Sequence, residues 1–323
     1  MIPQLLHPVK KNPMLNLTNL HPKMLIHLLS FLLPIYSIGQ TVENVPRAFA
    51  QLSVEPELIL LDNAINVPTE SGHLQGVQWV EVGASEKLLI SGSSRHTAYL
   101  LQANLDTKKT ELLIPLMREP FRHAGGIQVS DSHLVVGIED NHLKTIAKLA
   151  LYQIHGDSAL QITPSLSIHR EGAVERYTAG ATGLIQLNGQ YLVVVGNWDS
   201  RNWDFYLIDP EMENWDLIES FDAPADWASY QSINLIKDQD QVYAIGLYGA
   251  GDVGRADLIL ISNSHVFKPV MSKISSKVFH CVGGVDFNTA AGIQVDSIGN
   301  LHLWATQRDA FQQISVNRYA PKK

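Results

Sequence analysis

The chain has 323 residues, of which 45% are hydrophobic and 17% charged, so it is long enough to bury a substantial core. It carries 32 acidic against 24 basic side chains, a formal charge of −8, and this acidic balance disfavours nucleic acid as a partner. The single cysteine, Cys281, excludes an internal disulfide, and no cysteine–histidine spacing indicates zinc, so we expect no metal and no other cofactor.

Residues 1–39 are expected to be a signal peptide rather than part of the fold. A lysine precedes the apolar run KMLIHLLSFLLPIYSIGQ (23–40), and Ser37 and Gly39 place small residues at the −3 and −1 positions of a cut before Gln40. The run is short for a bilayer span, so we expect no stable membrane insertion after cleavage, with a retained anchor as the alternative. Export without disulfides predicts a periplasmic or secreted protein.

Residues 40–56 are interpreted as a leader, and residues 57–323 as a single domain that begins with the strand ELILLD (57–62). After this strand, one hairpin pattern occurs five times. Each copy has a short apolar strand, usually opened by glycine and containing glutamine, then a polar turn and a second apolar strand that ends in a small residue. The copies are HLQGVQWVEVGASEKLLISGSSRH (73–96), HAGGIQVSDSHLVVGIED (123–140), TGLIQLNGQYLVVVGNWDSR (182–201), QSINLIKDQDQVYAIGLYGAGD (231–252) and AAGIQVDSIGNLHLWATQRD (290–309).

The stretches between the copies leave room for further strands. Third strands are predicted at 97–105, 145–154, 205–209, 257–262 and 312–319. Fourth strands are predicted at 110–116, 160–168, 215–221 and 265–271. The last copy lacks a fourth strand, and residues 57–62 supply one. The sequence therefore predicts an all-β fold, a five-bladed β-propeller of four-stranded antiparallel blades closed by its N-terminal strand. A two-sheet β-sandwich is the alternative.

The inner hairpin also carries a family resemblance. The stretch GIQVDSIGNLHLWA (292–305) resembles the inner strands of secreted bacterial propellers with NHL- or lyase-like repeats. The resemblance covers only the repeat core, so it implies the fold and not the chemistry.

One face of such a propeller is expected to hold the site. The loops that precede first strands and follow second strands share a face, and here they are long and rich in polar and aromatic residues, whereas the opposite turns are plain. Arginines and acids at equivalent places, such as Arg95, Arg308 and Asp199, are alternatively explained by structural salt bridges. The predicted ligand contacts are His73, Arg95, Arg122, His123, Glu139, Trp198, Asp199, Tyr230, Asn288 and Arg308.

The predicted function is the binding of a small polar or carbohydrate-like ligand in this funnel. His73 and His123 occupy equivalent places in adjacent copies, so a hydrolase or lyase that uses them as acid and base, with Glu139 as a further catalytic candidate, is the first alternative. A glycosidase needs two carboxylates. The starts of first strands here carry mostly His, Thr or Tyr, which counts against a glycosidase. Trp198 and Tyr230 either stack on a sugar or pack within the fold. An adaptor that binds a protein partner is the second alternative.

Overall fold

The computed structural model describes residues 40–322, apart from 69, 71, 156–160, 240 and 263–268. The predicted signal peptide, residues 1–39, lies outside the described residues. No helix in the described part of the chain is long and apolar enough to cross a membrane.

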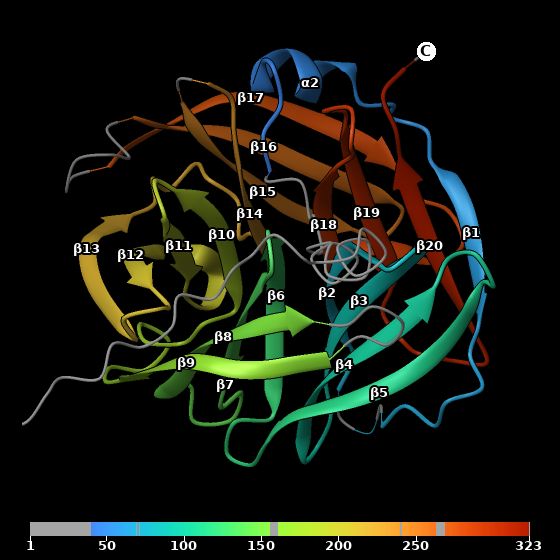
Figure 1. Cartoon of the computed structure of the whole chain (residues 1–323), viewed down its shortest axis with the longest axis horizontal. Coiled ribbons are helices and arrows are strands. Elements are labelled where there is room, and N and C mark those ends of the chain that lie inside the picture. The colour runs from blue at the N-terminus through green and yellow to red at the C-terminus, as the bar shows by residue number, and fades with distance from the viewer. Residues whose placement is uncertain are drawn as a thin grey trace, which may run out of the picture. The chain divides into compact units, whose positions relative to one another are not determined.

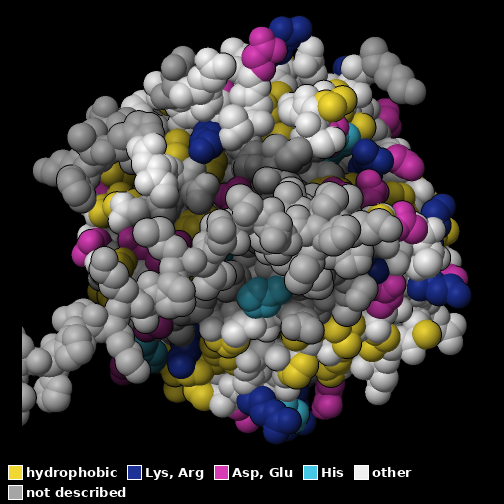
Figure 2. All heavy atoms as spheres, in the orientation of Figure 1, with side chains coloured by type: hydrophobic (Ala, Val, Ile, Leu, Met, Phe, Trp, Pro, Cys, Tyr) yellow, Lys and Arg dark blue, Asp and Glu magenta, His cyan; other side chains and the backbone are white. Residues whose placement is uncertain are grey.

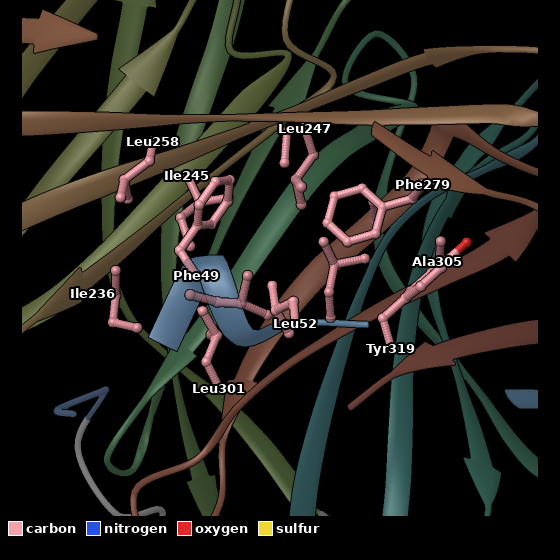
Figure 3. Packing of buried hydrophobic residues seen from close by; sticks show 14 of the residues in the cluster. Phe49, Leu52, Ile236, Ile245, Leu247, Leu258, Phe279, Leu301, Ala305 and Tyr319 are labelled. Carbon is pink, nitrogen blue, oxygen red and sulfur yellow. The ribbon is translucent and has the colours of Figure 1, made fainter. Parts of the chain in front are cut away.

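A short helix, α2 (Val45–Gln51), precedes the first strand, where the sequence predicts only a leader. The Asn44 side chain caps its start by accepting a hydrogen bond from the Arg47 backbone N–H at 2.8 Å. At the other end, the Lys277 ammonium group donates to the backbone carbonyls of Phe49, Ala50 and Leu52. In Figure 3, Phe49 and Leu52 point from this segment into a buried cluster with side chains that include Ile236, Ile245, Leu301 and Tyr319.

The remaining described elements are strands, apart from the single-turn helix η2 (Trp198–Ser200). They are β1 (Glu57–Asp62), β2 (Leu74–Val82), β3 (Ser85–Ser93), β4 (Thr97–Asn104), β5 (Lys109–Arg118), β6 (His123–Ser130), β7 (His133–Glu139), β8 (Ile146–His155), β9 (Gln161–Glu171), β10 (Ala181–Leu187), β11 (Gln190–Gly196), β12 (Asn202–Asp209), β13 (Asn214–Asp222), β14 (Ser232–Lys237), β15 (Val242–Ala250), β16 (Val253–Ser262), β17 (Val270–His280), β18 (Val285–Val295), β19 (Leu301–Gln307) and β20 (Gln313–Tyr319). The all-β prediction is confirmed.

Antiparallel pairing joins these strands in consecutive groups. The groups are β2–β5 (set 1), β6–β9 (set 2), β10–β13 (set 3), β14–β17 (set 4) and β18–β20 together with β1 (set 5). The first strands β2, β6, β10, β14 and β18 contact one another in that order, and β18 also meets β2. Figure 1 shows the sets arranged around this inner group of strands. Each predicted hairpin is present as the first two strands of one set.

One predicted strand is misplaced. The sequence predicts the fourth strand of set 4 at 265–271, but residues 263–268 lie outside the described part and β17 runs from Val270 to His280. Most of its side chains are exposed or half-buried, because β17 is the outermost strand and one of its faces meets water. Such a strand carries serines and lysines and shows no continuous apolar run.

Side-chain amides fill the space between the first strands. The Gln128 carbonyl oxygen on β6 accepts hydrogen bonds from the backbone N–H groups of Leu184 (2.8 Å) and Leu235 (2.6 Å), and its amide nitrogen donates to the Leu235 carbonyl. Gln78 on β2 donates to the Asn234 side chain on β14 at 3.2 Å. All these residues are buried. The amides therefore satisfy backbone groups that face the axis, where no neighbouring strand pairs with them.

Close approach of the first strands explains one of the repeated glycines. A Cβ atom at Gly292 of β18 would lie 1.9 Å from the Val77 carbonyl oxygen of β2. No side chain fits at that distance, so the backbones of set 5 and set 1 meet only because glycine has none.

Charged side chains surround this core. Figure 2 shows Lys, Arg, Asp and Glu side chains of both signs around the edge of the face in view, with hydrophobic side chains between them.

Candidate functional site

A small pocket lies where first strands begin and second strands end, and it encloses about 80 Å³. Its lining draws on sets 1, 2, 3 and 4, so residues distant in the chain converge here. Among the predicted contacts, the residues that line it are His73, His123, Glu139, Trp198, Asp199 and Tyr230.

The other predicted contacts do not line the pocket. Arg95 is exposed, and its guanidinium lies 3.4 Å from the Glu70 carboxylate. Arg122 donates to the Arg95 backbone carbonyl at 3.1 Å. Asn288 and Arg308 are exposed on set 5 and at the end of β19. These four side chains belong to the rim of the pocket. For Arg95, the ion pair with Glu70 agrees with the alternative prediction of a structural salt bridge.

His73 is half-buried, and the groups around it fix its ring. Its Nδ1 lies 2.9 Å from the Leu74 carbonyl oxygen, and the Gln75 amide nitrogen lies 2.7 Å from Nδ1 and 2.9 Å from Nε2. Burial lowers the pKa of His73, partly offset by the Leu74 carbonyl. The rings of His73 and His123 meet edge to face with centroids 5.9 Å apart.

His123 and Glu139 are direct partners in the register of β6 and β7. The Asn141 amide nitrogen lies 3.4 Å from His123 Nδ1, a contact that suits the tautomer in which Nδ1 accepts and Nε2 carries the proton. Nε2 lies 3.8 Å from Glu139 Oε1, beyond hydrogen-bond distance. Glu139 is fully buried, and its Oε2 accepts a hydrogen bond from the Ala179 N–H at 2.8 Å. Its Oε1 has no hydrogen-bond partner among the described residues.

Burial shifts both groups toward their neutral forms. It lowers the pKa of His123 to about 3, with further lowering from the positive charges of His73, Arg122 and Arg308. Burial raises the pKa of Glu139 to about 7, against the opposing effect of the Ala179 N–H. Near neutral pH, His123 is therefore neutral and has no proton to give as an acid. The group that titrates there is Glu139, which shifts the acid–base hypothesis from the histidines to the glutamate.

The two predicted aromatic contacts differ in role. Trp198 is half-buried, with the Lys144 ammonium 3.6 Å from its ring centroid, and it lines the pocket. Tyr230 is only 2% exposed, and its hydroxyl donates to the Asp257 carboxylate at 2.7 Å. Its ring packs edge to face against Trp203. Tyr230 thus serves mainly the packing of sets 3 and 4, whereas Trp198 offers its ring to the pocket.

Sequence reasoning missed the amides of the pocket. The other lining residues are Gln75, Asn141, Gly180, Asn197 and Gln231. Asn141 and Asn197 stand in the long loops that follow second strands, and Gln75 stands between a predicted histidine and the repeated glycine. Their position in or beside those loops could have identified them, but the prediction favoured charged and aromatic residues over amides. Among the described residues, no group of three or more His, Cys, Asp or Glu side chains is arranged to hold a metal ion.

No protein-family model matches the chain, and no curated protein matches it. Similar solved structures include an exo-β-1,3-galactanase from Phanerochaete chrysosporium in complex with β-1,3-galactotriose (10% identity, 84% of this chain and 64% of that chain, TM-score 0.46). Others are a thermostable family-43 glycoside hydrolase (8% identity, 79% and 91%, TM-score 0.49) and a hypothetical protein from Leishmania major (11% identity, 86% and 93%, TM-score 0.48).

The chain spans 64% of the length of that galactanase and 58% of one from Clostridium thermocellum. Identities of this size with TM-scores below 0.5 assign no family to the chain. The resemblance to NHL- and lyase-like repeats gains no support from these structures.

Proposed function

We propose that the protein binds a small, neutral, hydroxyl-bearing ligand of carbohydrate-like chemistry in the His123–Glu139 pocket. The single observation that carries this proposal is Glu139 Oε1, a buried carboxyl oxygen that belongs to a residue of the pocket lining and has no partner among the described residues. A buried polar atom without a hydrogen bond is costly, so its retention points to a ligand atom that completes it.

The proposal includes a statement about the fold, namely that the five sets are the blades of a propeller. Support comes from the consecutive antiparallel groups, from the ring of contacts among the first strands, and from β1, which joins β20. In a propeller, a blind opening on the axis is a common place for a ligand. The amides of Gln78 and Gln128 close the axis beneath it.

The gap between His123 and Glu139 suits a hydroxyl group. When Glu139 is ionised, Nε2–H is a donor and Oε1 is an acceptor, and the 3.8 Å between them is too long for a direct bond. A hydroxyl placed beside the pair, at hydrogen-bond distance from both atoms, accepts from Nε2–H and donates to Oε1. One functional group can do this only if it is both donor and acceptor.

The rest of the lining favours a neutral ligand over an anion. The residues that line the pocket include neither lysine nor arginine, the side chains that recognise phosphates and carboxylates, although Lys144 stands behind the lining against the Trp198 ring. They include instead the amides of Gln75, Asn141, Asn197 and Gln231, which donate and accept without net charge. Trp198 adds an aromatic surface against which the C–H groups of a sugar pack well.

The test is a calorimetric and thermal-shift screen of monosaccharides and cyclic polyols, repeated on Glu139→Gln. In that variant, the Ala179 N–H holds the amide oxygen, so the –NH₂ group takes the place of Oε1 and two donors face each other. We expect affinity to fall about tenfold for loss of one acceptor to a ligand hydroxyl. Glu171→Gln, an exposed glutamate at the end of β9, is the matched control. Binding that is unchanged in Glu139→Gln, or no binding by any compound, would contradict the proposal.

An enzyme with Glu139 as general acid is the second candidate, favoured by the pKa of Glu139 near 7. A carboxyl group with that pKa holds and releases a proton at physiological pH. On nitrophenyl glycosides and esters, such an enzyme loses rate as the pH rises through about 7, and Glu139→Gln abolishes turnover. Turnover that survives in this variant excludes Glu139 from the chemistry.

A further inference from the structure

The loop between β11 and β12 contains two consecutive residues with an unusual backbone. Asp199 has φ 60° and Ser200 has φ 49°, the left-handed region in which side chains other than glycine cost free energy. Neighbouring non-glycine residues in this region are rare, and here one of them, Asp199, lines the pocket.

Several hydrogen bonds hold this backbone in place. The Ser200 N–H donates to the Asn197 carbonyl at 2.8 Å, and the Ser200 hydroxyl donates to the Tyr230 carbonyl at 2.6 Å. Arg201 donates through Nε to the Asp199 carbonyl at 3.1 Å, and its guanidinium also donates to three carbonyls in the loop before β14. The conformation is therefore fixed by set 3 and set 4 together.

None of these bonds uses the Asp199 side chain. Its carboxylate is exposed and has no hydrogen bond or ion pair within the described part of the chain. This backbone thus places at the pocket a carboxylate that makes no hydrogen bond or ion pair with the described residues. Trp198, the preceding residue, is fixed in the same way, because its N–H donates to the Thr178 hydroxyl at 2.6 Å.

We propose that Trp198 and Asp199 form a rigid contact for two adjacent hydroxyl groups on a ring-shaped polyol. The two carboxylate oxygens accept one hydrogen bond from each hydroxyl, while the ring packs its C–H face on the side of the indole opposite the Lys144 ammonium. This inference rests on the proposed function, in which a further hydroxyl lies between His123 and Glu139. It adds that the ligand is a ring with a vicinal diol, such as a pyranose or a cyclitol.

The experiment compares simple probes by ligand-observed NMR titration. The probes are myo-inositol, cis-1,2-cyclohexanediol, cyclohexanol and cyclohexylamine. The wild-type chain should bind the two vicinal diols more tightly than cyclohexanol. Asp199→Asn, which tolerates the left-handed backbone, should reduce this preference about fivefold by removing an acceptor oxygen. Asp199→Gly should weaken diol binding at least as much while the melting temperature stays constant or rises by about 2 °C.

Glu213→Gly is the matched control, because Glu213 is also an exposed acid with a left-handed backbone (φ 50°), in the turn between β12 and β13. It should change the melting temperature in the same direction as Asp199→Gly without changing any affinity. Diol binding that depends on Glu139 but not on Asp199 overturns this inference and leaves the proposed function standing. Tighter binding of cyclohexylamine than of the diol also overturns it, since Asp199 would then select a cation. No binding by any probe overturns both.

Discussion

Replacing Gln128 with leucine removes the amide that connects the first strands of sets 2, 3 and 4. The backbone N–H groups of Leu184 and Leu235 lose their acceptor, and the Leu235 carbonyl loses a donor. Gln128, Leu184 and Leu235 have no exposed surface, so water cannot readily replace the lost partners.

The expected loss of stability follows from counting those groups. A buried donor without a partner costs roughly 1–3 kcal/mol, so two of them give about 4 kcal/mol for Gln128→Leu. Gln78→Leu leaves one N–H, that of Val129, without its 3.2 Å bond, and about 2 kcal/mol is expected. Urea unfolding followed by tryptophan fluorescence measures both, and 4 kcal/mol corresponds to a midpoint lower by about 1 M.

The control is Gln186→Leu, the same change on β10 at an exposed position, for which a change within about 0.5 kcal/mol is expected. The expected order of destabilisation is Gln128, then Gln78, then Gln186. A Gln128→Leu variant within about 1 kcal/mol of Gln186→Leu would refute the argument that these amides hold the axis together.

Three further predictions concern the pocket and the closest backbone contact. Between pH 4.5 and 7 the folded chain keeps a proton on Glu139 that the unfolded chain gives up, so stability falls by about 3 kcal/mol as pH rises through this window. Glu139→Gln should remove this fall, and urea unfolding at pH 5 and pH 8 with the same stability difference in both proteins would argue against it. His123 acts in the opposite sense, because the unfolded chain binds a proton below pH 6.5 and the folded chain only near pH 3. His123→Asn should therefore lose less stability on acidification from pH 6.5 to 3, and an unchanged acid-unfolding curve would contradict this. Gly292→Ala should lower the free energy of unfolding in urea by about 3 kcal/mol or more, because the new Cβ would lie 1.9 Å from the Val77 carbonyl oxygen. Gly180→Ala, whose Cβ would have no atom nearer than 3.8 Å, should change it by less than about 1 kcal/mol. Equal effects of the two substitutions would be inconsistent with the described packing.

The hairpins were predictable because their signal is local. Apolar alternation on both sides of a polar turn is contained within about 20 residues, and each copy strengthens the others. Helix α2 was missed because seven residues are too few to show a helical period, although Asn44 and Pro46 are start signals. The misplaced strand in set 4 was missed because an outermost strand with one wet face lacks an apolar run.

The loops of the site were predictable, but the direction of each side chain was not. The pairing of β2 with β3 shifts between Leu74 and Val77, and the pairing of β6 with β7 shifts between Ala124 and Ile127. Such bulges lie directly after His73 and His123 and change which side of the strand faces the axis. Nothing in the residue types announces them. The inward direction of Tyr230 was not predictable either, because its hydrogen-bond partner Asp257 lies on β16, 27 residues further along the chain.

The pairing of β1 with β20 places the first strand and the last strand of the fold side by side, from Glu57 opposite Arg318 to Asp62 opposite Gln313. During synthesis, the leucine-rich segment 57–62 therefore leaves the ribosome long before its partner strand β20 is made. Until then, its apolar side chains and backbone lack that partner. Because contacts between distant residues slow folding, we expect the pairing of β1 with β20 to be a late step of folding. A nascent protein that stalls or is cut short before residue 313 offers that naked edge to any other chain nearby.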